Sequence, residues 1–329
     1  MTRRILVTGG AGFVGSHLVA ALLERGDDVT VFDDLSTGHR AAVLPGARLI
    51  VGDLADAAAL DAALAPGGWH AVFHFAALSL VGDSMRQPMH YLRTNIGNGL
   101  ALIDACVRHG VPRFVLSSTA ALFGSAGAGA IDESAAIDPG SPYGESKAAL
   151  ERALLWADRI HGLRSAALRY FNAAGADPAG RLGEDHRPES HLVPLVIDAA
   201  LGRRAEMSIF GTDYPTPDGT CVRDYVHVTD LAQAHLCALA QLNHSSVTYN
   251  LGNGAGTSVL EVIRAVERVG GRKVPVAIAP RRPGDPAFLV AASGRIRREA
   301  GWNPEYGAID AIVASAWAWR EAHPLGYAG

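Results

Sequence analysis

The fold is decided near the start of the chain, by the stretch Ile5-Leu6-Val7-Thr8-Gly9-Gly10-Ala11-Gly12-Phe13-Val14-Gly15. The three apolar residues predict a short strand, the glycines predict a tight turn, and the apolar pattern of residues 14–23 predicts a helix. A helix that begins directly after such a turn points its first N–H groups and the positive end of its dipole at a phosphate. The stretch therefore predicts a turn that binds the pyrophosphate of a dinucleotide.

A second apolar strand, at residues 29–32, ends in Asp33, eighteen residues after Gly15. An acidic residue at this distance from the turn accepts hydrogen bonds from the hydroxyls of an adenosine ribose. Asp33, with Asp34 beside it, would also repel a 2′-phosphate, so NAD is expected rather than NADP. A glycine-rich turn that binds nothing is the simpler alternative, but the strand before it, the helix after it and Asp33 argue against that alternative.

Length and composition limit the class of protein. With 329 residues the chain can form one large domain or two closely joined ones, and 49% apolar and 19% charged residues are typical of a globular protein. A net charge of −4 with no basic stripe argues against a nucleic-acid partner, and no apolar stretch is long enough to cross a membrane. Cys106, Cys221 and Cys237 show no pattern, which suits a reducing cytoplasm. The thirteen histidines do not take metal-ligand spacing, so no metal is expected.

Strands and helices alternate through the first half of the chain. Strands are expected at residues 5–7, 29–32, 48–51, 71–76, 113–117 and 165–170, with helices at 55–64, 91–109 and 143–161. This alternation predicts an α/β fold with a doubly wound parallel (Rossmann-type) sheet, which binds ligands beyond the carboxyl ends of its strands. The residues at those ends are Asp33, Asp53, Leu54, Ala76, Ala77, Ser117, Ser118, Thr119 and Asn172.

The pattern changes after Asn172. Loops are expected at residues 175–188, 211–219 and 280–286, strands at 224–228 and 247–251, and helices at 191–201, 230–242, 258–269 and 308–321. We expect a smaller α/β substrate domain built from two separate segments. In this division residues 1–172 and about 222–254 bind the cofactor, and about 173–221 and 255–329 bind the substrate.

The segment Tyr143-Gly144-Glu145-Ser146-Lys147 opens the predicted helix at 143–161. Residues four apart share a helix face, so the Lys147 ammonium lies one turn from the Tyr143 phenol. A nearby cation favours the phenolate, which would lower the pKa of Tyr143 toward that of a general base. The chain has only one other lysine, Lys273, so such a pair is rare by chance. An ordinary exposed helix face is the alternative for this pair. Thr119, at the end of a strand, could help pass the proton of a reacting hydroxyl to Tyr143; a hydroxyl that only ends the strand is the alternative.

Longer strings carry a resemblance that covers the whole chain. They are the glycine turn, Ser117-Ser118-Thr119, Tyr143 with Lys147, Leu168-Arg169-Tyr170-Phe171-Asn172, Ile209-Phe210-Gly211-Thr212-Asp213-Tyr214-Pro215-Thr216-Pro217-Asp218-Gly219-Thr220, Val222-Arg223-Asp224-Tyr225-Val226-His227-Val228 and Pro280-Arg281-Arg282-Pro283-Gly284-Asp285. Together these strings closely resemble the UDP-glucose (UDP-galactose) 4-epimerases of the extended short-chain dehydrogenase/reductase superfamily.

The resemblance implies a tightly held NAD that is regenerated in each turnover. Tyr143 would take the proton of the sugar 4-hydroxyl while C4 gives its hydride to the nicotinamide, and the 4-keto sugar would turn over and receive hydride on its other face. Thr119 would bridge sugar and tyrosine, and Lys147 would hold the nicotinamide ribose. The resemblance also implies a homodimer formed by helices at residues 91–109 and 143–161.

The same resemblance assigns binding residues. Those for NAD are Gly9, Gly12, Phe13, Val14, Gly15, Asp33, Asp34, Asp53, Leu54, Phe75, Ala76, Ala77, Asn95, Ser117, Tyr143, Lys147 and Tyr170. Those for UDP-glucose or UDP-galactose are Thr119, Tyr143, Asn172, His191, Leu192, Phe210, Arg223, Arg282, Asp285 and Phe288. A bulky Phe288 near sugar C2 would disfavour N-acetylated sugars; packing in the core of the second domain is the alternative for this side chain.

Three other functions stay open at this point. A nucleotide-sugar 4,6-dehydratase would need an acid and a base directly after the threonine, where this chain has Ala120 and Ala121. An NAD-sensing protein without catalysis would not need the Tyr143 and Lys147 pair. A 4-epimerase of another UDP-sugar (UDP-xylose or UDP-arabinose, UDP-glucuronate or UDP-N-acetylglucosamine) fits the same residues.

Overall fold

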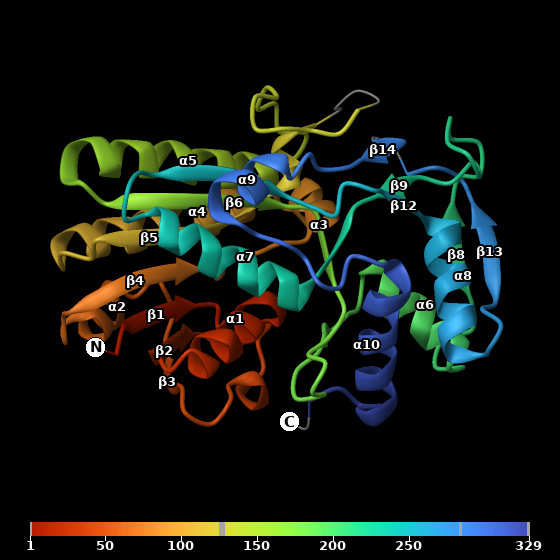
Figure 1. The fold of residues 1–329 in the computed structure, drawn as a ribbon, viewed down its shortest axis with the longest axis horizontal. Helices are drawn as coiled ribbons and strands as arrows, with labels where there is room; N and C mark the ends of the chain where they lie inside the picture. The colour runs from red at the N-terminus through yellow and green to blue at the C-terminus, as the bar shows by residue number, and fades with distance from the viewer. Residues whose placement is uncertain (1, 125–128, 283–284, 328–329) are drawn as a thin grey trace.

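The computed structural model describes residues 2–124, 129–282 and 285–327. Its central feature is a parallel sheet that is seven-stranded within the described residues (Figure 1). In spatial order the strands are β11 (Val247–Leu251), β6 (Arg164–Tyr170), β5 (Arg113–Thr119), β4 (Trp69–His74), β1 (Arg4–Thr8), β2 (Asp28–Asp33) and β3 (Arg48–Val51). The chain winds outward in both directions from β1, so the strand order reverses between β1 and β4. This confirms the expected doubly wound sheet.

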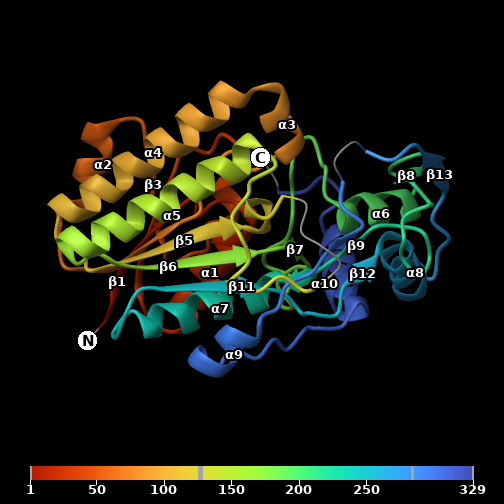
Figure 2. The same ribbon diagram turned by 90° about the horizontal axis from the view of Figure 1, so that it is seen from above.

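Helices cover both faces of the sheet. On one face lie α1 (Phe13–Glu24) and α7 (Val228–Gln241), and their apolar side chains form one core with β1, β2 and β11. On the other face lie α2 (Ala57–Leu64), α4 (Pro88–Arg108) and α5 (Pro142–His161), which form a second core. Figure 2 shows α4 and α5 side by side along that face. Both faces are buried, which is why the strands read as continuous apolar runs in the sequence.

A third core belongs to the second half of the chain, to the right in Figure 1. It packs α6 (Leu192–Ala200), α8 (Val259–Gly270) and α10 (Ile309–Ala322) around β8 (Met207–Phe210), which pairs with β13 (Val276–Ala279). The remaining elements are α3 (Val81–Arg86), α9 (Gly294–Ala300), β7 (Asn172–Ala174), β9 (Val222–Arg223), β10 (Tyr225–His227), β12 (Thr257–Ser258), β14 (Phe288–Leu289) and the 3-10 helices η1 (Arg40–Ala42) and η2 (Ala120–Leu122).

The helix ends follow local rules, and most of the expected elements are confirmed. The Asp56 side chain accepts hydrogen bonds from Ala58 N and Ala59 N, so α2 begins later than expected. Ser141 caps α5 in the same way, with Pro142 in its first turn. Sequence reasoning missed α3, α9 and several short strands, among them β8 and β13. These pieces have little periodicity of their own and are held by their partners.

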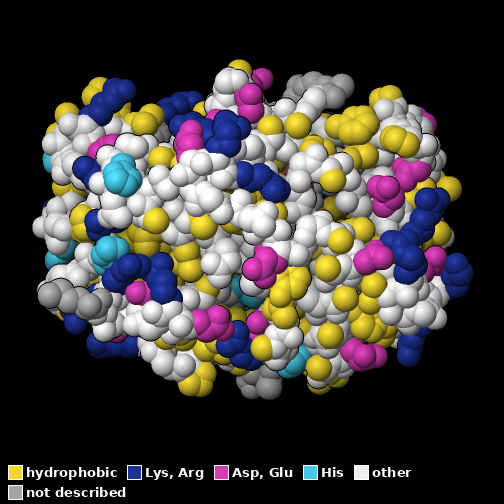
Figure 3. All heavy atoms as spheres, viewed as in Figure 1, with side chains coloured by type: hydrophobic (Ala, Val, Ile, Leu, Met, Phe, Trp, Pro, Cys, Tyr) yellow, Lys and Arg dark blue, Asp and Glu magenta, His cyan; other side chains and the backbone are white. Residues whose placement is uncertain are grey.

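The surface in Figure 3 carries basic and acidic side chains scattered among each other. Among the described residues, no helix has the length and apolar character needed to span a membrane.

Candidate active site

The glycine turn between β1 and α1 can be built only with glycine at two places. Gly9 has a φ of 72°, and a Cβ there would lie 2.4 Å from Ala76 N. A Cβ on Gly15 would lie 2.2 Å from Gly9 O. Gly12 caps α1 without a side-chain acceptor, so the N–H groups of Phe13 and Val14 in the first turn remain for a ligand. This cradle fits a phosphate, as the sequence predicts.

Asp33 lies at the end of β2, as expected, and its side chain is 7% exposed. Its carboxylate accepts hydrogen bonds from Ala11 N (2.9 Å) and Leu35 N (2.9 Å), which fixes it beside the turn. Burial raises the pKa of Asp33, and the two N–H donors oppose that rise. Each oxygen keeps a second lone pair for a ribose hydroxyl. Asp34 is exposed next to it, bonded to Ser36 N.

The loop after β4 joins the turn. Phe75 N and Ala76 N both donate to Thr8 O, at 2.9 and 3.2 Å, and Ala77 follows them, half-buried. Asn95 holds the next part of this loop, since its side chain bonds both Leu78 N and Leu78 O at 2.9 Å. Asn95 thus shapes the loop.

Two of the expected cofactor residues follow β3. Asp53 is exposed and accepts a hydrogen bond from Ala55 N at 2.9 Å. Leu54 is buried in the core under α2 and α4. Asp53 therefore shapes the turn after β3, while Leu54 packs inward.

The chemistry-bearing residues meet at the carboxyl edge of the sheet. Tyr143 and Lys147 lie on the first two turns of α5, and Thr119 is the last residue of β5. Burial raises the pKa of the Tyr143 phenol, the neighbouring Tyr170 adds to the rise, and the Thr119 hydroxyl opposes it. The expectation that Lys147 lowers this pKa is therefore wrong for the protein groups by themselves. The cost of moving a phenolate out of water decides the direction of this shift, and Lys147 is not among the groups that set it.

Lys147 is 1% exposed, and burial lowers its pKa to about 8. No hydrogen bond of its Nζ is found among the described residues, although a buried ammonium normally has partners. An ammonium group without a protein hydrogen bond at this edge fits the hydroxyls of a bound ribose. Ser117, also expected here, bonds the Tyr170 hydroxyl at 2.6 Å, and burial raises the pKa of Tyr170 to about 12.

Sequence reasoning missed the support beneath Lys147. Glu151, one turn further along α5, accepts hydrogen bonds from Arg169 Nη2 (2.6 Å) and Ser118 Oγ (2.5 Å). The side chains of Glu151 and Arg169 are 8% and 7% exposed, so this ion pair is buried. The Glu151 charge also raises the pKa of Lys147, against the effect of burial. The signal was present in the sequence, because Tyr143, Lys147 and Glu151 are spaced four apart.

The expected UDP-binding residues form two contacts in the second half of the chain. The Arg282 guanidinium lies over the Phe210 ring, 4.0 Å from its centroid. Arg223, on β9, is ion-paired with Asp285. Asn172 lies nearby in the fold, since its N–H donates to Asp224 O at 2.9 Å and β7 pairs with β10. Pro283 and Gly284 of the same string lie outside the described residues.

Phe288 and His191 take well-defined places. Phe288 lies on β14, opposite Val222 of β9, half-buried and outside the core clusters of the described residues. His191 is the N-cap of α6, with Leu192 as the first residue of that helix. The His191 Nδ1 lies 2.6 Å from Glu184 Oε1.

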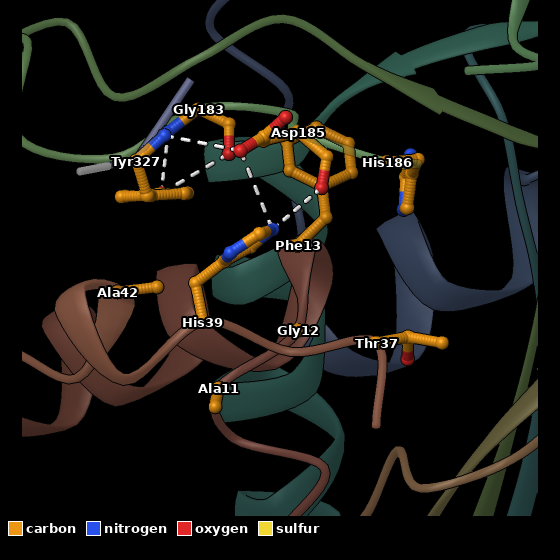
Figure 4. A pocket seen from close by; sticks show the side chains of 10 residues that line it. All are labelled: Ala11, Gly12, Phe13, Thr37, His39, Ala42, Gly183, Asp185, His186 and Tyr327. Atoms are coloured by element: carbon orange, nitrogen blue, oxygen red, sulfur yellow. Dashed lines mark hydrogen bonds and ion pairs between the residues drawn. The ribbon is translucent and has the colours of Figure 1, made fainter. Parts of the chain in front are cut away.

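The spacing of the histidines in the sequence predicts no metal, and this stays a prediction, although the fold gathers two histidines and two glutamates in one loop. Glu184, His186, Glu189 and His191 bring one potential ligand atom each within 4.8 Å of one another. The loop bends to gather side chains whose spacing in the sequence has no helix or strand period. His186 also lines a pocket beside the glycine turn (Figure 4), whose other walls include Gly12, Phe13 and His39.

The model of the NAD dependent epimerase/dehydratase family matches residues 5–252. A UDP-glucose 4-epimerase from Halalkalibacterium halodurans is 48% identical over 325 residues, which cover 98% of this chain and 97% of the relative. The chain belongs to this family, among its UDP-glucose 4-epimerases.

Solved structures agree with that placement. A crystal structure of a UDP-glucose 4-epimerase has a TM-score of 0.97 at 46% identity, covering 99% of this chain and all (100%) of the other. The UDP-glucose 4-epimerase from Bifidobacterium longum, in complex with NAD+ and UDP, has a TM-score of 0.93 at 37% identity and covers 98% and 100%. The cofactor is NAD, and the free N–H groups of α1, Asp33 and the unpartnered Lys147 fit it. The resemblance seen in the sequence is thereby confirmed.

Proposed function

We propose that this chain interconverts UDP-glucose and UDP-galactose. One observation carries the proposal: Thr119, Tyr143 and Lys147 meet at the carboxyl edge of the sheet that also carries the glycine turn. A phenol, a hydroxyl and an ammonium at that edge suit proton removal from a secondary alcohol during its oxidation. The relatives named above support the sugar nucleotide as substrate.

Each catalytic residue has one task in the proposal. NAD, when bound, takes up a hydride from sugar C4 and returns it to the opposite face. Tyr143 accepts the proton of the C4 hydroxyl and later gives it back. This needs the phenolate, which the positive charges of Lys147 and of bound NAD would favour. Thr119 holds that hydroxyl beside the phenol. Lys147 binds the ribose of the cofactor and brings its positive charge to the crevice.

The substrate nucleotide would lie against the second half of the chain. Arg223 and Arg282 supply guanidinium groups for the phosphates, which match such forks well. Phe210 offers a ring face to the uracil, with Arg282 already stacked on its other side. Asn172, His191, Leu192 and Asp285 line the rest of the path.

The expected division of labour belongs to the same proposal. Residues 1–172 and about 222–254 hold NAD, and residues 173–221 and 255–329 hold the UDP-sugar. The separate core around α6, α8 and α10 supports this division.

The assay is turnover of purified protein on UDP-galactose without added NAD, with UDP-glucose followed by NMR. We expect conversion to an equilibrium mixture with cofactor carried by the protein itself. Tyr143→Phe, which removes the proton acceptor, should lose about a hundredfold or more in kcat. Near-normal turnover in a folded Tyr143→Phe variant would show that another group removes the proton.

A homodimer through α4 and α5 is part of the proposal. These helices expose large apolar side chains: Leu100 (43% exposed), Leu155 (52%), Trp156 (62%) and Ile160 (66%). Exposed apolar groups gathered on neighbouring helices are typical of an interface. Ile160→Glu should therefore give monomers in sedimentation velocity, whereas Leu325→Glu, at an 85% exposed site elsewhere, should not. A dimer that persists in Ile160→Glu would exclude this face.

We also infer a reducing compartment such as the cytoplasm. Cys106, Cys221 and Cys237 are all free thiols. A reducing environment is where such thiols persist. Removal of reductant from the purified enzyme should therefore allow slow oxidation of the half-buried Cys221 and Cys237, which mass spectrometry would detect as added oxygen.

A further inference from the structure

Four side chains of the loop before α6 converge on one point. They are Glu184, His186, Glu189 and His191, whose ligand atoms all lie within 4.8 Å of one another. His191 Nδ1 lies 2.6 Å and His186 Nδ1 lies 3.3 Å from Glu184 Oε1. Each of these nitrogens lies 3.6 Å from Glu189 Oε1. The proposed epimerase chemistry places His191 along the substrate path and gives the other three side chains no task.

These atoms lie at ion-pair distances, but not in hydrogen-bond geometry. Glu184 Oε1, His186 Nδ1, Glu189 Oε2 and His191 Nδ1 are buried and have no hydrogen-bond partner among the described residues. Glu184 as a whole is only 5% exposed. Ion pairs between protonated imidazoles and the two carboxylates are one explanation of this cluster, and a shared cation is the other. Four ligand atoms gathered within 4.8 Å of one another are what a bound cation requires.

The donor set fits a transition-metal ion. Two imidazole nitrogens and two carboxylate oxygens provide four ligands, and the carboxylates balance a divalent charge. Tetrahedral zinc with bonds of about 2.0–2.2 Å places its ligand atoms roughly 3.3 Å apart. The distances of 2.6, 3.3 and 3.6 Å lie around that value, so small side-chain movements would complete the site.

The loop that carries these ligands is held in place by other contacts. The Tyr327 hydroxyl bonds Gly183 N at 3.0 Å and Gly183 O at 3.1 Å. His39 Nε2 lies 2.9 Å from Asp185 O, so the loop is tied to the segment after β2 (Figure 4). The nearby Arg320 is 3.8 Å from Glu189 Oε2, but its charge is balanced by its ion pair with Asp198.

We propose that Glu184, His186, Glu189 and His191 bind one divalent transition-metal ion, with zinc the best match. All four positions are filled by protein, so the ion is structural and has no open position for a substrate. It would fix His191 as the N-cap of α6 and hold His186, which packs edge-on against Phe13. The ion would therefore link the start of the substrate helix to the cofactor turn.

The test is titration of the purified, chelator-treated protein, with its NAD bound, with Zn²⁺ in the calorimeter. We expect one ion per chain. Co²⁺ in place of Zn²⁺ should give visible d–d absorption without a thiolate charge-transfer band, which excludes Cys221 as a ligand. Chelator should lower the Tm, and Zn²⁺ should restore it.

Two variants and one control locate the site. Glu189→Gln keeps the shape of the side chain and should weaken Zn²⁺ binding at least about tenfold. His186→Gln is the second variant, for use if the first does not fold. His161→Ala, at an exposed histidine on α5, should bind as the parent protein does. A Kd above about 1 mM in the parent, or unchanged affinity in the folded ligand variants, would overturn the proposal.

Discussion

Replacing Glu151 by glutamine tests the buried support of the catalytic helix. The glutamate accepts hydrogen bonds from Arg169 at 2.6 and 3.0 Å and from Ser118 at 2.5 Å, and both charged side chains are more than 90% buried. Glutamine keeps the size of the side chain and one acceptor oxygen but removes the charge. Arg169 would then be left buried without a counter-ion.

The magnitude follows from that burial. Removing one partner of a buried ion pair costs about 3–5 kcal/mol, because the other charge stays out of water unpaired. Since glutamine keeps one acceptor, we expect about 3 kcal/mol, or about a hundredfold in the unfolding equilibrium constant. The exposed pair of Arg108 and Asp104 provides a matched control, because Asp104 is 69% exposed. Asp104→Asn should cost less than about 1 kcal/mol.

Urea unfolding of the four proteins measures these differences: parent, Glu151→Gln, Asp104→Asn, and the double variant Glu151→Met with Arg169→Met. The double variant should lose less stability than Glu151→Gln, since it leaves no charge unpaired. A loss in Glu151→Gln no larger than in Asp104→Asn would refute the reasoning. So would a double variant that is less stable than the single one.

The same substitution should change the pH profile. Burial lowers the pKa of Lys147 to about 8, and Glu151 opposes that shift. Without the Glu151 charge the pKa falls further, so the ammonium is lost at a lower pH. The alkaline decline of kcat/KM should therefore move to lower pH in Glu151→Gln. If the alkaline decline of kcat/KM stays at the same pH in Glu151→Gln, Glu151 does not influence the pKa of Lys147.

Three further predictions concern the cofactor, the sugar and acid stability. Asp33 accepts hydrogen bonds from ribose hydroxyls and repels a 2′-phosphate, so the nucleotide released on denaturation should be NAD. Asp33→Ala should weaken the preference for NAD over NADP. NADP as the main released species would contradict this prediction. If Phe288 limits the space at sugar C2, an N-acetyl group there would cost about 1–3 kcal/mol by overpacking, which predicts a roughly five- to 150-fold preference for UDP-glucose over UDP-N-acetylglucosamine. Phe288→Gly should reduce this preference. Equal kcat/KM values for the two sugars in the parent enzyme would show that Phe288 does not limit the sugar. Burial lowers the pKa of His17, His227 and His235 to about 4 and that of His74 to about 3. Below pH 6.5 the unfolded chain therefore binds more protons than the folded chain, and the free energy of unfolding falls on acidification. The loss is up to about 1.4 kcal/mol per pH unit for each histidine. Stability measured from pH 7 to 5 should fall less steeply in His235→Gln, and an unchanged slope would exclude His235 from this effect.

Local pattern was enough to predict the parallel sheet and the glycine turn that follows its first strand. A strand, a glycine turn and a helix are neighbours in the chain, and Tyr143 and Lys147 are one helical turn apart. Such features depend on backbone geometry within a few residues, so the sequence alone determined the sheet, the phosphate cradle at Gly9 and Gly15, and the pair on α5. The same local logic would have reached Glu151 by its spacing.

Other features needed the tertiary structure. The pKa of Tyr143 rises because the folded chain removes the phenol from water, and the spacing of residues along the sequence does not show this burial. Arg282 meets Phe210, and Arg169 meets Glu151, only because separate strands and helices pack together. The loop from Glu184 to His191 has no period, so only its fold decides that four ligand atoms converge. Burial and long-range contact are properties of the packed chain, and no local pattern contains them.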